Sequence, residues 1–152
     1  MTPELVLTIF VAGIAAGTTF VFAAVGEIIT ERSGILNLGV EGMMLVGAVT
    51  GFLVNTHVQE PWVGAGAAVL AGAAMGLLHA LFVVGFKTNQ VVTGLALVIF
   101  GSGLSGYLGT SVVGEPPPAT FDPIAIPGLS SIPILGRIFF NQDALVYLSY
   151  FL

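Results

Sequence analysis

Four long apolar segments follow one another along the chain, at residues 5–26, 35–54, 62–86 and 91–113. The first contains no charged residue and would be about 33 Å long as an α-helix, which is enough to cross the roughly 30 Å hydrocarbon core of a bilayer. No basic region precedes it, and it is longer than the apolar core of a secretory signal peptide. The pattern therefore predicts four retained transmembrane helices.

A proline-rich segment at residues 114–143 interrupts this pattern. Its prolines exclude a continuous helix, yet the isoleucines, leucines and phenylalanines between them make it too apolar for a solvated linker. We interpret the segment as a folded cap on the membrane surface, partly re-entrant where protein covers its backbone. An interfacial segment that only anchors its aromatic residues is equally compatible with the pattern.

After this segment the chain becomes apolar again, at residues 144–152. As a helix this stretch would cover about 13.5 Å, which is less than half of the hydrocarbon core. A terminal carboxylate at that depth would have no favourable surroundings, so we expect the sequence to stop within a fifth span of an incomplete domain. The predicted fold class is an all-α membrane protein, a polytopic transmembrane helix bundle with four complete spans and the start of a fifth.

Composition and charge narrow the possible functions. Hydrophobic residues make up 56% of the chain and charged residues 7%, whereas a soluble domain contains about 25% charged residues. A net charge of −5 without a basic patch argues against a nucleic-acid partner. The sequence has no cysteine and no motif for phosphate binding, nucleophilic catalysis or metal-dependent hydrolysis, so we expect neither an enzyme nor a bound cofactor or metal.

The three basic residues predict how the chain is oriented. Arg32 and Lys87 lie in the short connections after the first and third segments, and Arg137 lies in the proline-rich segment. Short cytoplasmic loops of membrane proteins carry an excess of Lys and Arg. The connections that contain Arg32 and Lys87 are therefore expected to be cytoplasmic. Because one span separates the first of them from the N-terminus, we expect the N-terminus to be extracytoplasmic.

Small residues recur four positions apart along the apolar segments, which places them on one face of each helix. Such faces allow helix backbones to approach closely in lipid, so the spans are expected to form a packed bundle. The alternative is the general abundance of glycine in membrane helices. The glycines expected at helix contacts are Gly13, Gly17, Gly47, Gly51, Gly72 and Gly76.

Few ionisable residues lie within the apolar segments, which argues against a proton relay or an ion-coupled carrier. Glu41 either lines an aqueous vestibule or has a structural role, as an acceptor for helix ends or a partner of Arg32. His79 either contacts the substrate or packs as a buried histidine. Glu27 and Glu31 are expected to be ordinary solvated charges on a short helical turn.

Polar residues also gather at the predicted cytoplasmic ends of the second and fourth segments. We interpret them as candidates for a translocation pathway or gate, and helix capping by Ser33, Thr88 or Asn89 is the competing interpretation. Together with the two ionisable residues, the candidate site residues are Asn37, Glu41, His79, Asn89, Gln90 and Thr93.

Three stretches carry a resemblance to a known family. Residues 31–48 read ERSGILNLGVEGMMLVGA, residues 89–97 read NQVVTGLAL, and residues 126–136 read IPGLSSIPILG. The chain resembles the integral-membrane permeases of ATP-binding-cassette (ABC) importers, in the group that includes branched-chain amino acid, ribose-type sugar and nucleoside systems. The third stretch most resembles the nucleoside and simple-sugar branch, in which a histidine often occupies the position of His79.

The resemblance covers nearly the whole chain but about the N-terminal half of a family member. It implies a permease subunit in the lipid of the cytoplasmic membrane that forms part of a pathway for a nucleoside or simple sugar. Its implied partners are a second permease subunit, two cytoplasmic ATP-binding subunits, which would hydrolyse the ATP, and an extracytoplasmic substrate-binding lipoprotein. The alternatives are a branched-chain amino acid permease, a small homo-oligomeric channel or secondary carrier, and a non-transporting membrane scaffold.

Overall fold

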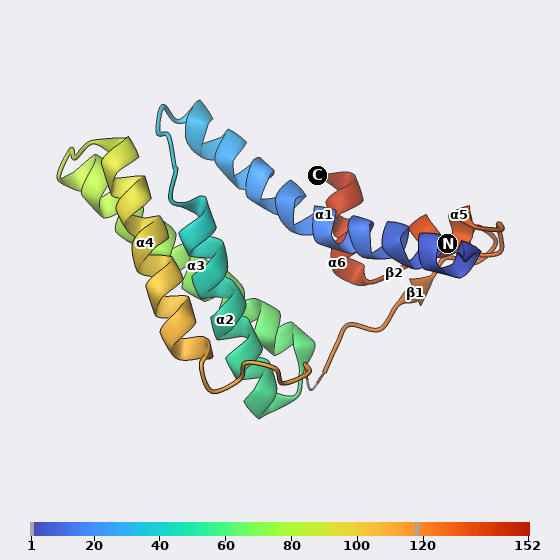
Figure 1. Ribbon diagram of the computed structural model, residues 1–152. Coiled ribbons are helices and arrows are strands. Elements are labelled where there is room, and N and C mark those ends of the chain that lie inside the picture. Colours follow the sequence, from blue (N-terminus) through green and yellow to red (C-terminus); the bar gives the residue numbers. More distant parts are fainter. Residues whose placement is uncertain (1, 118) are drawn as a thin grey trace. The chain divides into compact units, whose positions relative to one another are not determined.

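The computed structural model describes residues 2–117 and 119–152, and most of them are helical (Figure 1). The long helices coincide with the apolar segments of the sequence, and the proline-rich segment forms short elements and turns. In chain order the elements are α1 (Pro3–Arg32), α2 (Val40–Val58), α3 (Pro61–Ala80), the π-helical turn η1 (Leu81–Gly85), α4 (Gln90–Gly109), β1 (Ile124–Ala125), α5 (Leu135–Phe139), β2 (Asn141–Gln142) and α6 (Ala144–Phe151).

Three helical stretches of the described residues are long and apolar enough to cross a membrane. They are Glu4–Arg32, Pro61–Gly85 and Gln90–Gly109. The prediction of a helical membrane protein is confirmed at this level. The second predicted span is not among the three, because α2 contains Glu41, Asn55 and His57. That α2 crosses the membrane, and that the short α6 begins a fifth span, stay predictions.

Several helix boundaries differ from the predicted spans, and at the start of α2 polar contacts set the boundary. α2 begins at Val40 and not near residue 35, because side chains of Glu27 and Gln90 hold the preceding backbone in an irregular path. α1 continues to Arg32, beyond the predicted end at residue 26, since a helix need not stop where its apolar run stops. α4 ends at Gly109 and turns follow it.

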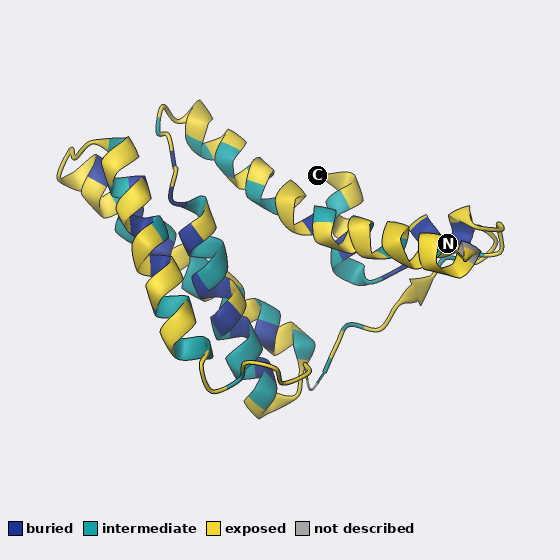
Figure 2. Cartoon of the chain, viewed as in Figure 1, coloured by how far each residue is buried: buried dark blue, intermediate teal, exposed yellow. Residues whose placement is uncertain are grey.

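The described chain contains two compact units. One comprises residues 27–120 and is called the three-helix unit here; the other comprises residues 1–26 and 121–152 and is called the cap unit. In the three-helix unit, α2 packs against both α3 and α4, and buried residues concentrate on it (Figure 2). Its apolar core joins Val46, Met75 and Leu97, one from each helix. α2 is therefore the central helix of this unit.

Glycines bring the backbones of these helices into direct contact. A Cβ atom built on Gly101 of α4 would lie 2.6 Å from the Cα atom of Gly42 on α2. On another face of α2, a Cβ on Gly51 would lie 2.9 Å from the Gly64 carbonyl oxygen, and a Cβ on Gly64 would lie 2.9 Å from that of Gly51. Real carbon atoms do not approach so closely, so side chains are excluded at these crossings.

The cap unit is held together by its own hydrogen bonds. β1 and β2 pair in an antiparallel register, with Ile124 opposite Gln142. Asp143 caps α6, since its carboxylate accepts the N–H groups of the second and third residues after it, at 2.8 and 3.0 Å. The Tyr147 hydroxyl donates to the Ile124 carbonyl oxygen at 2.6 Å. The proline-rich segment thus contains a folded structure from residue 124 onward.

Candidate functional site

The segment at residues 33–39, which joins α1 to α2, is tethered from two sides. From α1, one carboxylate oxygen of Glu27 accepts the backbone N–H of Asn37 at 2.9 Å. From the first residue of α4, the side-chain oxygen of Gln90 accepts the Leu36 N–H at 2.7 Å, and its amide nitrogen donates to the Gly34 carbonyl oxygen at 3.4 Å. We call the segment 33–39 together with Glu27 and Gln90 the linker clamp. They connect the ends of three helices through a segment with no regular structure.

Asn37 lies at the centre of the linker clamp and is buried. Its side-chain oxygen accepts the Gly39 N–H at 3.0 Å, and its amide nitrogen donates to the Met43 sulfur at 3.5 Å. These contacts fix the turn by which the chain enters α2. The N-cap position of α2 is Gly39, with no side-chain cap. The prediction that Ser33 caps this helix is therefore wrong, because its hydroxyl donates to the Thr30 carbonyl oxygen instead.

Glu27 is a residue of the candidate site that the sequence interpretation did not single out. Its carboxylate is half-buried, accepts the Thr30 hydroxyl at 3.2 Å and binds the backbone of the linker clamp. The prediction of an ordinary solvated charge is wrong for Glu27, whereas Glu31 is exposed. A signal that could have identified Glu27 is its place at the end of an apolar run, one helical turn before a threonine.

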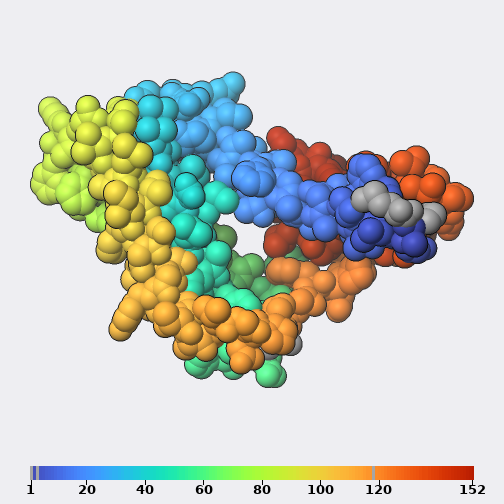
Figure 3. Space-filling view, in the orientation of Figure 1, coloured from blue at the N-terminus to red at the C-terminus, as the bar shows by residue number. Residues whose placement is uncertain are grey.

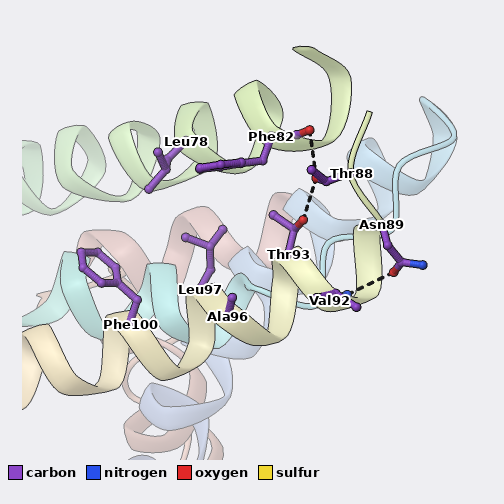
Figure 4. Close-up of a pocket in the computed structure, with 9 residues that line it drawn as sticks. All are labelled: Leu78, Phe82, Thr88, Asn89, Val92, Thr93, Ala96, Leu97 and Phe100. Atoms are coloured by element: carbon purple, nitrogen blue, oxygen red, sulfur yellow. Dashed lines mark hydrogen bonds between the residues drawn. The ribbon is translucent and has the colours of Figure 1, made fainter. Parts of the chain in front are cut away.

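A cavity of about 420 Å³ lies between the end of α3 with η1 and the start of α4 (Figure 4). Its polar groups are Thr88, Asn89 and Thr93, and its other lining residues are apolar: Leu78, Phe82, Val92, Ala96, Leu97 and Phe100. The Thr88 and Thr93 hydroxyls lie 2.8 Å apart, and Thr88 also donates to the Phe82 carbonyl oxygen at 2.9 Å. None of these lining residues is ionisable, so the cavity suits an uncharged ligand.

Asn89 also caps α4. Its side-chain oxygen accepts the N–H groups of Val91 and Val92, at 3.0 and 3.1 Å. The capping interpretation is confirmed for this residue. The amide nitrogen of the same side chain points away from the start of α4 and from the other lining residues, as Figure 4 shows.

The two ionisable candidates differ in their surroundings. His79, in the last turn of α3, is buried to 4% exposure, and neither of its ring nitrogens has a hydrogen-bond partner among the described residues. Glu41 lies in the first turn of α2 and is exposed, and the described part of the chain pairs it with no basic residue, Arg32 included. The structure thus brings Asn37 and Gln90 together in the clamp, and Asn89 and Thr93 in the cavity, while Glu41 stands apart.

The six glycines expected at helix contacts lie in two kinds of environment. Gly47 and Gly51 face backbone atoms of α3, at 3.1 and 2.9 Å from a Cβ position. Gly13, Gly17, Gly72 and Gly76 have no atom of the described chain within 4 Å of that position apart from their own helix backbone and chain neighbours. The closest backbone crossing uses Gly42 and Gly101, which the spacing of small residues did not single out.

Residues 9–149 match the model of a family described as branched-chain amino acid transport system / permease component. The chain is 41% identical over 142 residues to a putative glucose ABC transporter permease of Haloferax volcanii, covering 91% of this chain and 43% of the relative. It is 32% identical to a guanosine ABC transporter permease of Bacillus subtilis, covering 97% and 52%, and 30% identical to a nucleoside ABC transporter permease of Lactococcus lactis, covering 84% and 43%. The chain therefore spans about half the length of these relatives. No solved structure matches it at a significant level.

Proposed function

Since the chain belongs to the branched-chain amino acid transport system / permease component family of ABC transporter permeases, we propose that it forms part of the pathway by which an importer moves a nucleoside or simple sugar across the cytoplasmic membrane. The observation that carries this proposal is the similarity over 84 to 97% of the chain to permeases named for a sugar or for nucleosides. Because the relatives include both cargo classes, the proposal names both. Nucleosides and simple sugars share hydroxyl groups and carry no net charge.

The cavity supports this choice of cargo. A site for a charged amino group and carboxylate would need opposite charges or several aligned donors, because burying an unpaired charge is costly. The cavity offers hydroxyl and amide groups on an apolar wall instead. Asn37, Glu41, His79, Asn89, Gln90 and Thr93 are the residues that we assign to the pathway or its gate.

The packing of the three-helix unit supports a role as a rigid body that moves as a whole. The glycine crossings join α2 to α3 and α4 without room for sliding side chains, so these helices would tilt as one body during alternating access. Gly13, Gly17, Gly72 and Gly76, whose Cβ positions meet no neighbouring element of the described chain, would then face helices of the second permease or of the remaining half of a family member. The bundle would place four spans and the start of a fifth in the membrane, with the N-terminus and the proline-rich segment at residues 114–143 outside.

The energy source lies with the partners in this proposal. ATP would be hydrolysed by two cytoplasmic ATP-binding subunits, and an extracytoplasmic lipoprotein would deliver the cargo. The chain would act as a transport subunit and not as an enzyme, with no cofactor of its own.

Uptake by cells that naturally encode the chain tests the proposal. Deletion of its coding sequence should abolish high-affinity uptake of one radiolabelled nucleoside or sugar, and a plasmid copy should restore it. A copy with Thr93→Val, which keeps the side-chain shape and removes the cavity hydroxyl, should restore uptake about two- to tenfold less well, the value of one lost neutral hydrogen bond.

The matched control is Thr56→Val. Within the described chain the Thr56 hydroxyl donates to the Phe52 carbonyl oxygen of its own helix, at 2.8 Å, and Thr56 lies outside the cavity lining, so this copy should restore uptake fully. Loss of leucine uptake on deletion, with nucleoside and sugar uptake intact, would contradict the assigned cargo. Unchanged uptake of all three classes would contradict the transport function itself.

A further inference from the structure

The cap unit contains a groove that is separate from the cavity assigned above to the transport pathway. It has a volume of about 840 Å³ and lies between the first turns of α1 and the short helix α5. Its walls are formed by apolar side chains. Four of these side chains are exposed: Val6, Phe10, Ile134 and Leu135. In the space-filling view these two segments lie side by side (Figure 3).

Two opposite charges stand at this groove. Glu4 and Arg137 are the ionisable members of its lining, and the Arg137 guanidinium lies 3.5 Å from both carboxylate oxygens of Glu4. This distance exceeds the roughly 2.7–2.9 Å of a charge-assisted hydrogen bond. The side chains remain 61% and 76% exposed. The pair is therefore loose, and both partners keep donors and acceptors for a further ligand.

The wall contributed by α5 is built before any ligand arrives. Ile134 adopts a φ of 68°, and the Leu135 N–H donates across it to the Pro133 carbonyl oxygen at 2.8 Å. This is the rare form of γ-turn, and a β-branched residue adopts it only where neighbouring structure enforces it. Gly136 supplies that enforcement, because a Cβ there would lie 2.7 Å from the Ser130 carbonyl carbon. A preformed wall reduces the entropy lost on binding.

We propose that this groove binds one phospholipid of the phosphatidylethanolamine type. An acyl chain lies along the apolar walls, the phosphate contacts Arg137, and the ammonium group contacts Glu4. Glu4 marks the end of the first apolar segment, which is the level at which lipid headgroups lie. Arginine recognises phosphate through its planar set of donors, and a carboxylate accepts the N–H groups of a primary ammonium.

The charge pair also predicts a headgroup preference. Phosphatidylcholine has the same net charge, but its quaternary ammonium has no N–H to donate to Glu4. Phosphatidylglycerol offers a phosphate to Arg137, but its headgroup has no positive charge for Glu4. The chain should therefore retain phosphatidylethanolamine about two- to fivefold better than either, which is the range of one exposed ion pair.

Native mass spectrometry of the chain in a non-ionic detergent, titrated with each of the three lipids in turn, measures this preference. Glu4→Gln should equalise phosphatidylethanolamine and phosphatidylcholine, and Arg137→Gln should weaken both. Glu60→Gln, which removes an exposed acid of the three-helix unit, is the control for net charge and should leave the preference unchanged.

A second pair of variants separates the apolar wall from the charges. Phe10→Ala should weaken retention of all three lipids, whereas Phe20→Ala should not, because Phe20 is exposed on the same helix and lies outside the groove lining. Equal retention of the three lipids by the unmodified chain, or a preference that survives Glu4→Gln, would overturn the proposal. Retention of no lipid, or occupation of the groove by a second copy seen as a lipid-free dimer, would overturn it as well.

Discussion

Replacement of Gly101 by alanine tests whether backbone contact between α2 and α4 holds the three-helix unit together. The new methyl carbon would lie 2.6 Å from the Gly42 Cα atom, whereas carbon atoms pack at about 3.5–4.0 Å. The two helices must therefore separate by about 1 Å at this point. We expect Gly101→Ala to destabilise the unit.

The magnitude follows from two opposing terms. Overpacking of a tight contact costs about 1–3 kcal/mol, and replacing glycine by alanine inside a helix returns about 0.5–1 kcal/mol. Gly103 allows the second term to be measured by itself, because it lies on the same helix and no other element of the described chain comes within 4 Å of its Cβ position. The difference in unfolding free energy between Gly101→Ala and Gly103→Ala is then the packing term, about 1–3 kcal/mol.

Unfolding of both variants in mixed detergent micelles, with increasing sodium dodecyl sulfate and helix content followed by circular dichroism, measures this difference. Gly103→Ala should unfold at the same or a higher denaturant fraction than the unmodified chain, and Gly101→Ala at a lower one. Equal midpoints for the two variants, or a more stable Gly101→Ala, would refute the claim that the helices touch at this glycine.

Three further predictions concern the clamp, the α4 cap and the topology. Gln90→Ala should release the Leu36 backbone and speed proteolysis within residues 33–39, whereas Gln90→Glu keeps the acceptor and should not; equal cleavage rates would contradict the clamp. Asn89→Ala should lower the unfolding free energy by about 0.5–2 kcal/mol, whereas Asn89→Asp, which keeps a capping oxygen, should lower it much less, as measured by the same denaturant titration. No loss of stability in Asn89→Ala would contradict the capping role. In intact cells, an impermeant thiol reagent should label Glu115→Cys and not Lys87→Cys, and the opposite labelling would reverse the proposed orientation.

Much of the fold could be predicted from the order of residues because it depends on local chemistry. Long uncharged runs form helices in lipid since their backbone groups are satisfied within the segment, and α1, α3 with η1, and α4 each contain most of such a run. The motif between residues 31 and 48 pointed to the permease family, which the match over residues 9–149 confirms. Asn89 could be placed as a cap because its partners lie two and three residues away.

What only the tertiary structure decided involves groups that are distant in the chain. Glu27 and Gln90 both accept hydrogen bonds from the segment at residues 33–39, although they lie 63 residues apart in the sequence. These contacts delay the start of α2 to Val40. Spacing places glycines on a helix face, but the neighbour that the face meets depends on how the helices cross. For that reason Gly42 and Gly101 touch while Gly72 and Gly76 face open space.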